Sequence, residues 1–164
     1  MIKKVLSPED IKVTAQLAQK IWNQHYVPII GQDQVNYMVE KFQSEFAISN
    51  QLKEAYLYYY IEHSGKPCGY LALLPNKEKS RLMISKIYID VDFRGNNLGT
   101  ELLNFTISKS KEEQFKTIWL TVNKNNTKSI EWYKQKGFEI KEAVVFDIGN
   151  GFIMDDYLLE KSVG

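Results

Sequence analysis

Residues 84–99, ISKIYIDVDFRGNNLG, contain the residue types that a phosphate-binding site needs. An alternating apolar pattern predicts a strand, which leads into a loop with two glycines and two asparagines before a helical pattern begins. Backbone N–H groups at such a helix start converge on one point, where the helix dipole adds positive potential. Small residues let the backbone curl closely around an anion, and Arg94 adds a cation. The segment therefore predicts an anion site.

Two common phosphate loops are excluded by the same residues. The segment has no G-x-G-x-x-G pattern of a dinucleotide-binding fold and no G-K-[ST] ending of a Walker A loop. Short glycine motifs also match by chance. On the loop alone, an ordinary strand–turn–helix junction explains the glycines equally well.

A second pattern, at residues 126–138, favours the functional interpretation. It reads N-x-x-S-x-x-W-Y-x-x-x-G-F and consists of Asn126, Ser129, Trp132, Tyr133, Gly137 and Phe138. Together with R-G-N-N-L-G at 94–99, which matches [QR]-x-x-G-x-[GA] except at its middle glycine, it resembles the GCN5-related N-acetyltransferase (GNAT) superfamily. The resemblance is strong over residues 82–140 and extends to the whole chain in the order of elements. The aromatic pattern and the tail are more loosely similar to bacterial polyamine-type (spermine/spermidine) N-acetyltransferases.

The resemblance implies acetyl-CoA as co-substrate and no metal. The backbone at 87–89 would pair with the pantetheine arm, and N–H groups of residues 95–100 would hold the pyrophosphate. Asn126 would contact the pantetheine side, and Tyr133 would lie beside the thioester sulfur as the catalytic residue. The implied cofactor-binding residues are Ile87, Tyr88, Ile89, Arg94, Gly95, Asn96, Asn97, Leu98, Gly99, Thr100, Asn126 and Ser129.

Two positions depart from the family pattern. The middle glycine of the loop is Asn97 here, and asparagine is the non-glycine residue that best tolerates a positive φ. We therefore expect the loop to keep its shape. Many members carry a glutamate two residues before the I-Y-I segment as a base or water holder, whereas this chain has Ser85. The general base is therefore left open.

Acetyl transfer to an amine requires two proton transfers, one from the ammonium group and one to the leaving sulfur. An alkyl ammonium has a pKa near ~10.4 and a thiol near ~8.5, so the Tyr133 phenol is expected to protonate the leaving sulfur. Ser85 holding a water, or Glu40, His25 or Asp156, are the base candidates. Glu40 on a solvated helix face and His25 as a surface or cap residue are the simpler interpretations. The candidate substrate residues are Trp22, Tyr26, Tyr37, Glu40, Ser85 and Asp156.

The elements that must position these residues follow from periodicity and turn signals. Ser7-Pro8-Glu9-Asp10 predicts a helix start with Ser7 as N-cap, and the Tyr56–Tyr60 run predicts a strand packed by its rings. Helices are expected at 8–22, about 33–52 with a break near Ser44, 98–115 and 126–136, and strands at 2–6, 55–61, 67–74, 81–91, 117–122, 138–147 and 152–160. Strand–helix–strand units and hairpins together predict an α/β, GNAT-like fold: a mixed sheet of about seven strands with helices on both faces.

Composition narrows the class of protein. The chain has 164 residues, 21 basic and 20 acidic side chains and 44% apolar content, which fits one N-acetyltransferase domain over 1–164. The charge balance argues against nucleic acid as a partner, and no apolar stretch is long enough for a membrane span or a signal peptide. Cys68 is the only cysteine and lies in an apolar run, so we expect a buried residue rather than a nucleophile. We expect a cytoplasmic protein.

Three functional hypotheses follow. The first is acetylation of a small-molecule amine, with a polyamine as the leading candidate. The second is acetylation of a protein N-terminus or lysine, and the third is a catalytically silent acyl-CoA-binding module. The intact loop and Tyr133 favour an enzyme, and the lack of an acidic run disfavours a basic protein acceptor. A homodimer is left open.

Overall fold

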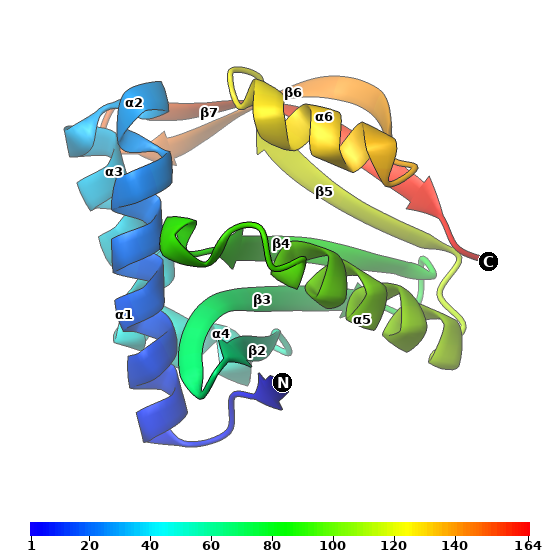
Figure 1. The fold of residues 1–164 in the computed structure, drawn as a ribbon. Helices are drawn as coiled ribbons and strands as arrows, with labels where there is room; N and C mark the ends of the chain where they lie inside the picture. Colours follow the sequence, from blue (N-terminus) through cyan, green and yellow to red (C-terminus); the bar gives the residue numbers. More distant parts are fainter. The chain divides into compact units, whose positions relative to one another are not determined.

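The computed structural model describes residues 1–164 and has a mixed α/β fold (Figure 1). Seven strands form one sheet in the order β1-β2-β3-β4-β5-β7-β6, which confirms the predicted fold class. In chain order the elements are β1 (Ile2–Lys4), α1 (Pro8–His25), α2 (Val27–Ile30), α3 (Gln32–Met38), the π-helical turn η1 (Val39–Gln43), α4 (Glu45–Lys53), β2 (Leu57–His63), β3 (Lys66–Asn76), β4 (Arg81–Ile89), the 3-10 turn η2 (Val91–Phe93), α5 (Leu98–Glu112), β5 (Thr117–Asn123), α6 (Thr127–Gln135), β6 (Glu139–Gly149) and β7 (Phe152–Ser162).

The chain folds as two compact units. The first unit contains residues 1–74 and 85–106, and the second contains residues 75–84 and 107–164. The candidate residues divide between them. Residues 85–100 belong to the first unit, whereas Asn126, Tyr133 and Asp156 belong to the second.

Helix α1 begins where the sequence predicts. The Ser7 hydroxyl accepts a hydrogen bond from the Asp10 backbone N–H at 3.1 Å, and the Asp10 carboxylate accepts one from the Ser7 N–H at 3.0 Å. This capping box satisfies two N–H groups that a helix start leaves without partners, and Pro8 occupies the first turn. The helix buries Leu17, Ala18, Ile21 and Trp22.

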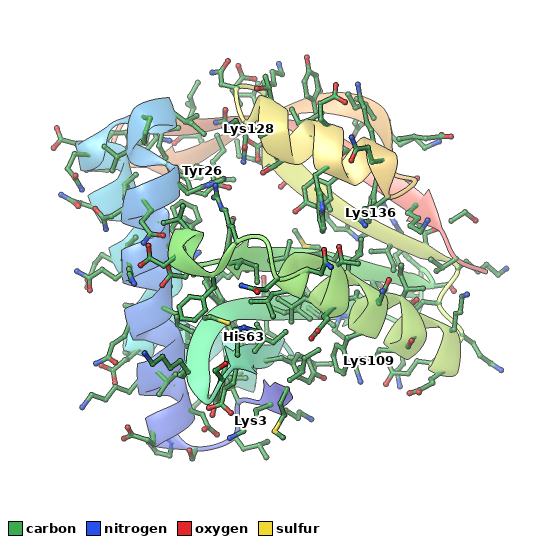
Figure 2. All side chains as sticks on the ribbon, in the orientation of Figure 1. Lys3, Tyr26, His63, Lys109, Lys128 and Lys136 are labelled. Carbon is green, nitrogen blue, oxygen red and sulfur yellow. The ribbon has the colours of Figure 1, made fainter.

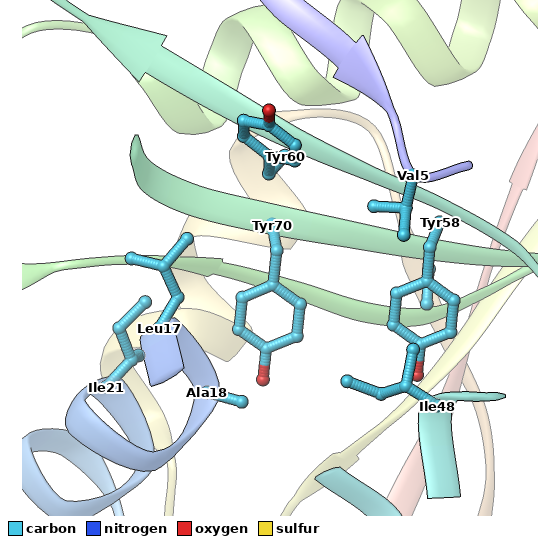
Figure 3. Packing of buried hydrophobic residues seen from close by; sticks show 9 residues of the cluster. Val5, Leu17, Ala18, Ile21, Ile48, Tyr58, Tyr60 and Tyr70 are labelled. Carbon is cyan, nitrogen blue, oxygen red and sulfur yellow. The ribbon is translucent and has the colours of Figure 1, made fainter. Parts of the chain in front are cut away.

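The core of the first unit lies between strands β2 and β3 and helices α1 and α4. Figure 3 shows the rings of Tyr58 and Tyr70 pointing toward the helices that carry Ala18 and Ile48. Each large apolar side chain removed from water contributes about 1.5–3 kcal/mol. On the other face of β2, the Tyr59 ring lies 4.8 Å from that of Phe105 in α5. The predicted role of the tyrosine run in strand packing is therefore confirmed.

The second helical region is more divided than its periodicity suggests. The predicted break at Ser44 is confirmed: Ser44 caps α4 by accepting from the Ala47 N–H at 3.1 Å. Before it, however, α3 passes into the π-helical turn η1, and the short helix α2 was not predicted at all. None of the helices is long and apolar enough to cross a membrane.

The second unit is built around β5. The strand pairs in parallel with the start of β4, Arg81–Met83 opposite Thr117–Trp119, and antiparallel with β7 along its whole length. Strands β6 and β7 form a hairpin whose turn, Gly149-Asn150-Gly151, has positive φ at all three residues. Helix α6 ends before Gly137, which has φ +94° and so terminates the helix as predicted.

Candidate active site

The loop between β4 and α5 has the curled backbone that an anion site requires. Gly95 has φ +87° and Asn97 has φ +58°, which confirms that Asn97 adopts the left-handed conformation expected of it. The Asn97 carbonyl then accepts the Glu101 N–H at 3.0 Å, so the helical bonds of α5 begin directly behind the turn. The N–H groups ahead of that bond have no partner within the helix.

The first part of the loop is exposed to solvent, and its last part is fixed in the core. Residues 94–97 are exposed and Leu98 is buried. A Cβ built on Gly95 would meet no atom within 4 Å, so there is room for a bulky anion against the backbone at this point. The residues present therefore fit a pyrophosphate group.

Side chains of helix α1 bind the residues that lead into this loop in the first unit. The Asp90 side chain is 3% exposed, and its carboxylate lies 2.7 Å from the Lys20 Nζ. It also accepts hydrogen bonds from Gln24 Nε2 at 3.2 Å and from the Asp92 N–H at 3.0 Å. Burial alone raises the pKa of Asp90, but the Lys20 ammonium and these donors outweigh it and hold the pKa below its usual value. The Asp90 carboxylate therefore links η2 to α1, because it contacts Lys20 and Gln24 of the helix as well as the Asp92 N–H of the 3-10 turn.

Two predicted residues meet at the same end of α1. Arg94 is exposed, and its guanidinium donates to His25 Nδ1 at 3.1 Å. An arginine cannot accept a hydrogen bond, so in this contact His25 Nδ1 is the acceptor and carries no proton. The contact between Arg94 and His25 thus joins the loop to the end of α1.

Aromatic side chains gather between the end of α1 and β4. The ring of Trp22 lies 4.3 Å from that of Tyr26 and 5.7 Å from that of Tyr88, and the hydroxyls of Tyr26 and Tyr88 are 3.3 Å apart. Figure 2 shows Tyr26 at the end of α1. Two candidate substrate residues, Trp22 and Tyr26, are therefore brought together beside the segment predicted to hold pantetheine.

The other candidates of the first unit lie apart from this cluster. Tyr37, on α3, is half-buried and its hydroxyl accepts from Lys41 Nζ at 3.1 Å. Glu40 is exposed on η1, and Ser85 is half-buried on β4.

Lys86 is a buried cation that the sequence analysis missed. It is 5% exposed, and its Nζ donates to the Phe42 carbonyl at 2.5 Å, to Gln51 Oε1 at 3.1 Å and to the Tyr58 hydroxyl. Burial lowers the pKa of Lys86 to about 7. A signal was present, because the two-residue period of β4 places Lys86 on the same face as the buried Leu82 and Ile84.

The second unit carries the other half of the predicted residues. Asn126 is buried, accepts the Ile130 N–H at 3.1 Å and starts α6. Tyr133 is buried on the same helix, with its ring 5.5 Å from that of Phe138, and Ser129 is half-buried. Lys128 and Lys136 mark the two ends of this helix in Figure 2. Helix α6 thus presents Asn126 and Tyr133 two turns apart.

Asp156 is the buried acid of the second unit. It lies on β7 opposite Asn123 of β5 and Val144 of β6, and it is 2% exposed. Burial raises the pKa of Asp156 to about 6, and the charge of Asp155 acts in the same direction. The Thr121 hydrogen bond and the charge of Lys124 oppose the rise in pKa.

The model of the acetyltransferase (GNAT) family matches residues 17–138. The chain belongs to this family. The matched range includes the loop at 94–99, Asn126 and Tyr133, so both patterns found in the sequence fall inside it.

Several known proteins are similar to this GNAT chain in part of the sequence or in fold. An uncharacterized N-acetyltransferase of Methanocaldococcus jannaschii is 38% identical over 92 residues, which cover 53% of this chain and 41% of the relative. Among solved structures, the PaiA N-acetyltransferase from Thermoplasma acidophilum, in complex with coenzyme A, has a TM-score of 0.81 at 17% identity and 99% coverage of both chains. A GCN5-related N-acetyltransferase from Rhodopseudomonas palustris has a TM-score of 0.82 at 19% identity, with 99% of this chain and 94% of that chain covered. These two likenesses establish the GNAT fold.

Proposed function

We propose that this GNAT chain transfers the acetyl group of acetyl-CoA to a primary amine of a small-molecule acceptor. Membership of the acetyltransferase family supports the reaction. The coenzyme A bound by the Thermoplasma acidophilum neighbour supports the choice of acyl donor.

The observation that carries the proposal is the backbone of the β4–α5 loop. The positive φ angles of Gly95 and Asn97 curl the backbone immediately before α5, whose first N–H groups have no partner within the helix. Such a turn at a helix start is suited to a pyrophosphate, because it supplies several donors and a favourable dipole without a side chain in the way. Residues 95–100 would hold the pyrophosphate, with Arg94 adding a positive charge.

The remaining roles follow from the chemistry of a thioester. The backbone N–H groups at 87–89 would bind pantetheine and polarise the acetyl carbonyl, and Asn126 and Ser129 would contact the pantetheine arm. Tyr133 would donate its phenol proton to the sulfur as the C–S bond breaks. No covalent enzyme intermediate is needed. Cys68 is buried, and burial raises the pKa of its thiol, so it is a poor nucleophile.

A small alkyl amine, with a polyamine first among candidates, suits the aromatic cluster best. The half-buried ring of Tyr88, packed beside the buried rings of Trp22 and Tyr26, offers a surface that can contact an alkyl chain and attract an ammonium group. Their position next to residues 87–89 puts that surface beside the expected site of the acetyl group. The broad acidic surface that a basic protein acceptor favours is not apparent in the charge pattern.

The test is release of free thiol from acetyl-CoA in the presence of different amines. The panel contains spermidine, lysine, a peptide with a free N-terminus and a peptide with an internal lysine. We expect the fastest release with spermidine. Faster release with a peptide would replace the small-amine proposal by a protein acceptor. No release with any amine, in a protein that acetyl-CoA still stabilises against heat, would indicate a binding module without transferase activity.

A further inference from the structure

Asp156 is a carboxyl group buried without a matching cation in contact. Within its unit, the Thr121 hydroxyl lowers the pKa of Asp156 by hydrogen bonding. The nearby Lys124 ammonium is bound instead to the neighbouring Asp155, with 2.8 Å between Nζ and Oδ1. A carboxylate can accept about four hydrogen bonds, and burial without a cation in contact disfavours its charged form. The arrangement leaves capacity for a charged donor.

The place of Asp156 in the sheet suits a ligand. Asp156 lies opposite Asn123, the last residue of β5, and the Asn126 N–H donates to the Asn123 carbonyl at 3.0 Å. Strand β5 pairs in parallel with β4, and ligands of α/β sheets bind at the carboxyl ends of such strands. Asp156 is therefore at the end of the sheet where a substrate is expected.

Asp156 and Tyr133 come from opposite faces of the sheet in the second unit. Lys161 of β7 donates to the carbonyl of Lys136, the residue that caps the end of α6. The odd-numbered residues of β7 therefore face that helix. Asp156 points the other way because side chains alternate along a strand. A reaction that removes one proton and delivers another is served well by two separate groups.

We propose that Asp156 binds the ammonium group of the acceptor and removes its proton. This inference rests on the proposed acetyltransferase function. It makes the acceptor a cationic alkyl amine, because an uncharged aromatic amine would leave the buried carboxylate without a counter-ion.

The other base candidates fit the role less well. Glu40 is exposed, so water competes with an amine for its carboxylate. The Nδ1 of His25 is engaged by Arg94 at 3.1 Å. Ser85 has no basic group of its own and could only hold a water. A desolvated carboxyl is a stronger base than a solvated one, and Asp156, with a pKa of about 6, is still ionised at neutral pH.

The protons and bonds of the step balance as follows. Asp156 takes one proton from the ammonium, and the neutral amine forms a C–N bond with the acetyl carbonyl carbon. The C–S bond then breaks with its electron pair on sulfur, which takes the phenol proton of Tyr133. The second proton on nitrogen returns through solvent to Tyr133, and Asp156 releases its proton to solvent. The products are the amide, free coenzyme A and one proton.

The test compares Asp156→Asn with the matched control Asp155→Asn. Both changes remove one negative charge from adjacent residues of β7, but Asp155 is half-exposed. We expect acetyl-CoA to stabilise both variants as it does the unmodified chain. At pH 7 the kcat/KM for spermidine, or for the amine of the panel that reacts fastest, should fall about 10²- to 10⁴-fold in Asp156→Asn and less than about threefold in Asp155→Asn.

The pH profile separates a base from a merely structural residue. With Asp156 as base, kcat/KM of the unmodified chain should reach a plateau above pH about 6. Asp156→Asn should instead gain activity steadily toward pH ~10, as free amine becomes abundant. Equal activity of the two variants, loss of acetyl-CoA binding in Asp156→Asn, or a profile of the unmodified chain that rises without a plateau would each overturn the assignment. The last measurement needs no variant, so it decides even if Asp156→Asn does not fold. Failure of the unmodified chain to release thiol with any amine overturns the transferase function itself.

Discussion

The Lys20 ammonium and the Asp90 carboxylate form an ion pair of 2.7 Å, although the lysine side chain is 51% exposed and the aspartate only 3%. The pair connects α1 to Asp90, the residue that follows β4 and begins the connection to α5. Because Asp90 also accepts the Asp92 N–H, its charge holds the backbone that leads into the predicted pyrophosphate loop. The geometry of the loop therefore depends on a residue outside it.

Removal of that charge should weaken both the fold and cofactor binding. Asp90→Asn keeps the shape of the side chain but gives the buried site a weaker acceptor, so we expect a loss of about 1–3 kcal/mol in unfolding free energy. A misplaced loop should also weaken acetyl-CoA binding by roughly tenfold or more. Urea unfolding and a calorimetric titration measure the two effects. Asp92→Asn is the control, because Asp92 also contacts Lys20, at 3.3 Å, but is 67% exposed and should cost less than about 1 kcal/mol. Equal losses in both variants would contradict a special role for Asp90.

Gly99 should be indispensable for binding acetyl-CoA. It is the second residue of α5 and half-buried, and a branched side chain there would stand between the backbone N–H groups and a phosphate. Acetyl-CoA at ~100 times its dissociation constant should stabilise the unmodified chain by about 2.7 kcal/mol, and Gly99→Val should abolish this gain. Asn104→Val places the same side chain at an exposed position of α5 and should retain the gain. A full thermal shift in Gly99→Val would remove the loop from the cofactor site.

Lys86 should make stability rise with pH. Burial lowers its pKa to about 7 in the folded chain, against 10.5 for an ordinary lysine. Between these values the unfolded chain binds more protons than the folded one, so raising the pH through this window favours folding. The melting temperature of the unmodified chain relative to Lys86→Met should therefore increase from pH 6.5 to pH ~10. Lys79→Met, at an exposed lysine of the β3–β4 turn, should show no such trend. A constant difference between the chain and Lys86→Met would mean that Lys86 keeps its proton throughout.

Local chemistry made much of this fold predictable from the sequence. The capping box at Ser7, the break at Ser44 and the positive φ of Asn97 each depend on a few adjacent residues, and each is confirmed. The strand ends were less accurate: β4 stops at Ile89 rather than 91, because Asp90 turns into η2.

The features that escaped prediction depend on distant residues. The π-helical turn η1 has no composition that marks it, and it is joined to the fold by Lys86, which bonds to the Phe42 carbonyl from 44 positions away. The burial of Asp156 is likewise a tertiary property, since its neighbours Asp155 and Tyr157 give no sign that one acid is solvated and the next is not. The roles assigned to Tyr133, Asn126 and the aromatic cluster stay predictions.

Tyr133→Phe tests the proton donor directly. The change removes one hydroxyl and keeps the ring that packs near Trp132 and Phe138, so fold and acetyl-CoA affinity should hardly change. If the phenol protonates the leaving sulfur, kcat should fall by a factor of about 10² to 10⁴. Tyr56→Phe, at a half-buried tyrosine beside the core of the first unit, controls for the loss of a hydroxyl and should keep its kcat.

Measuring kcat and acetyl-CoA affinity on one preparation of Tyr133→Phe separates three outcomes. A low kcat with unchanged affinity supports the general acid, because the hydroxyl then matters only as the C–S bond breaks. Weaker affinity with proportionally lower activity would make Tyr133 a binding residue. Full activity would mean that the thiolate leaves without a proton donor, and Tyr133 would then be a core aromatic residue. A thiol has a pKa near ~8.5, so its anion leaves far more readily than the anion of an amine.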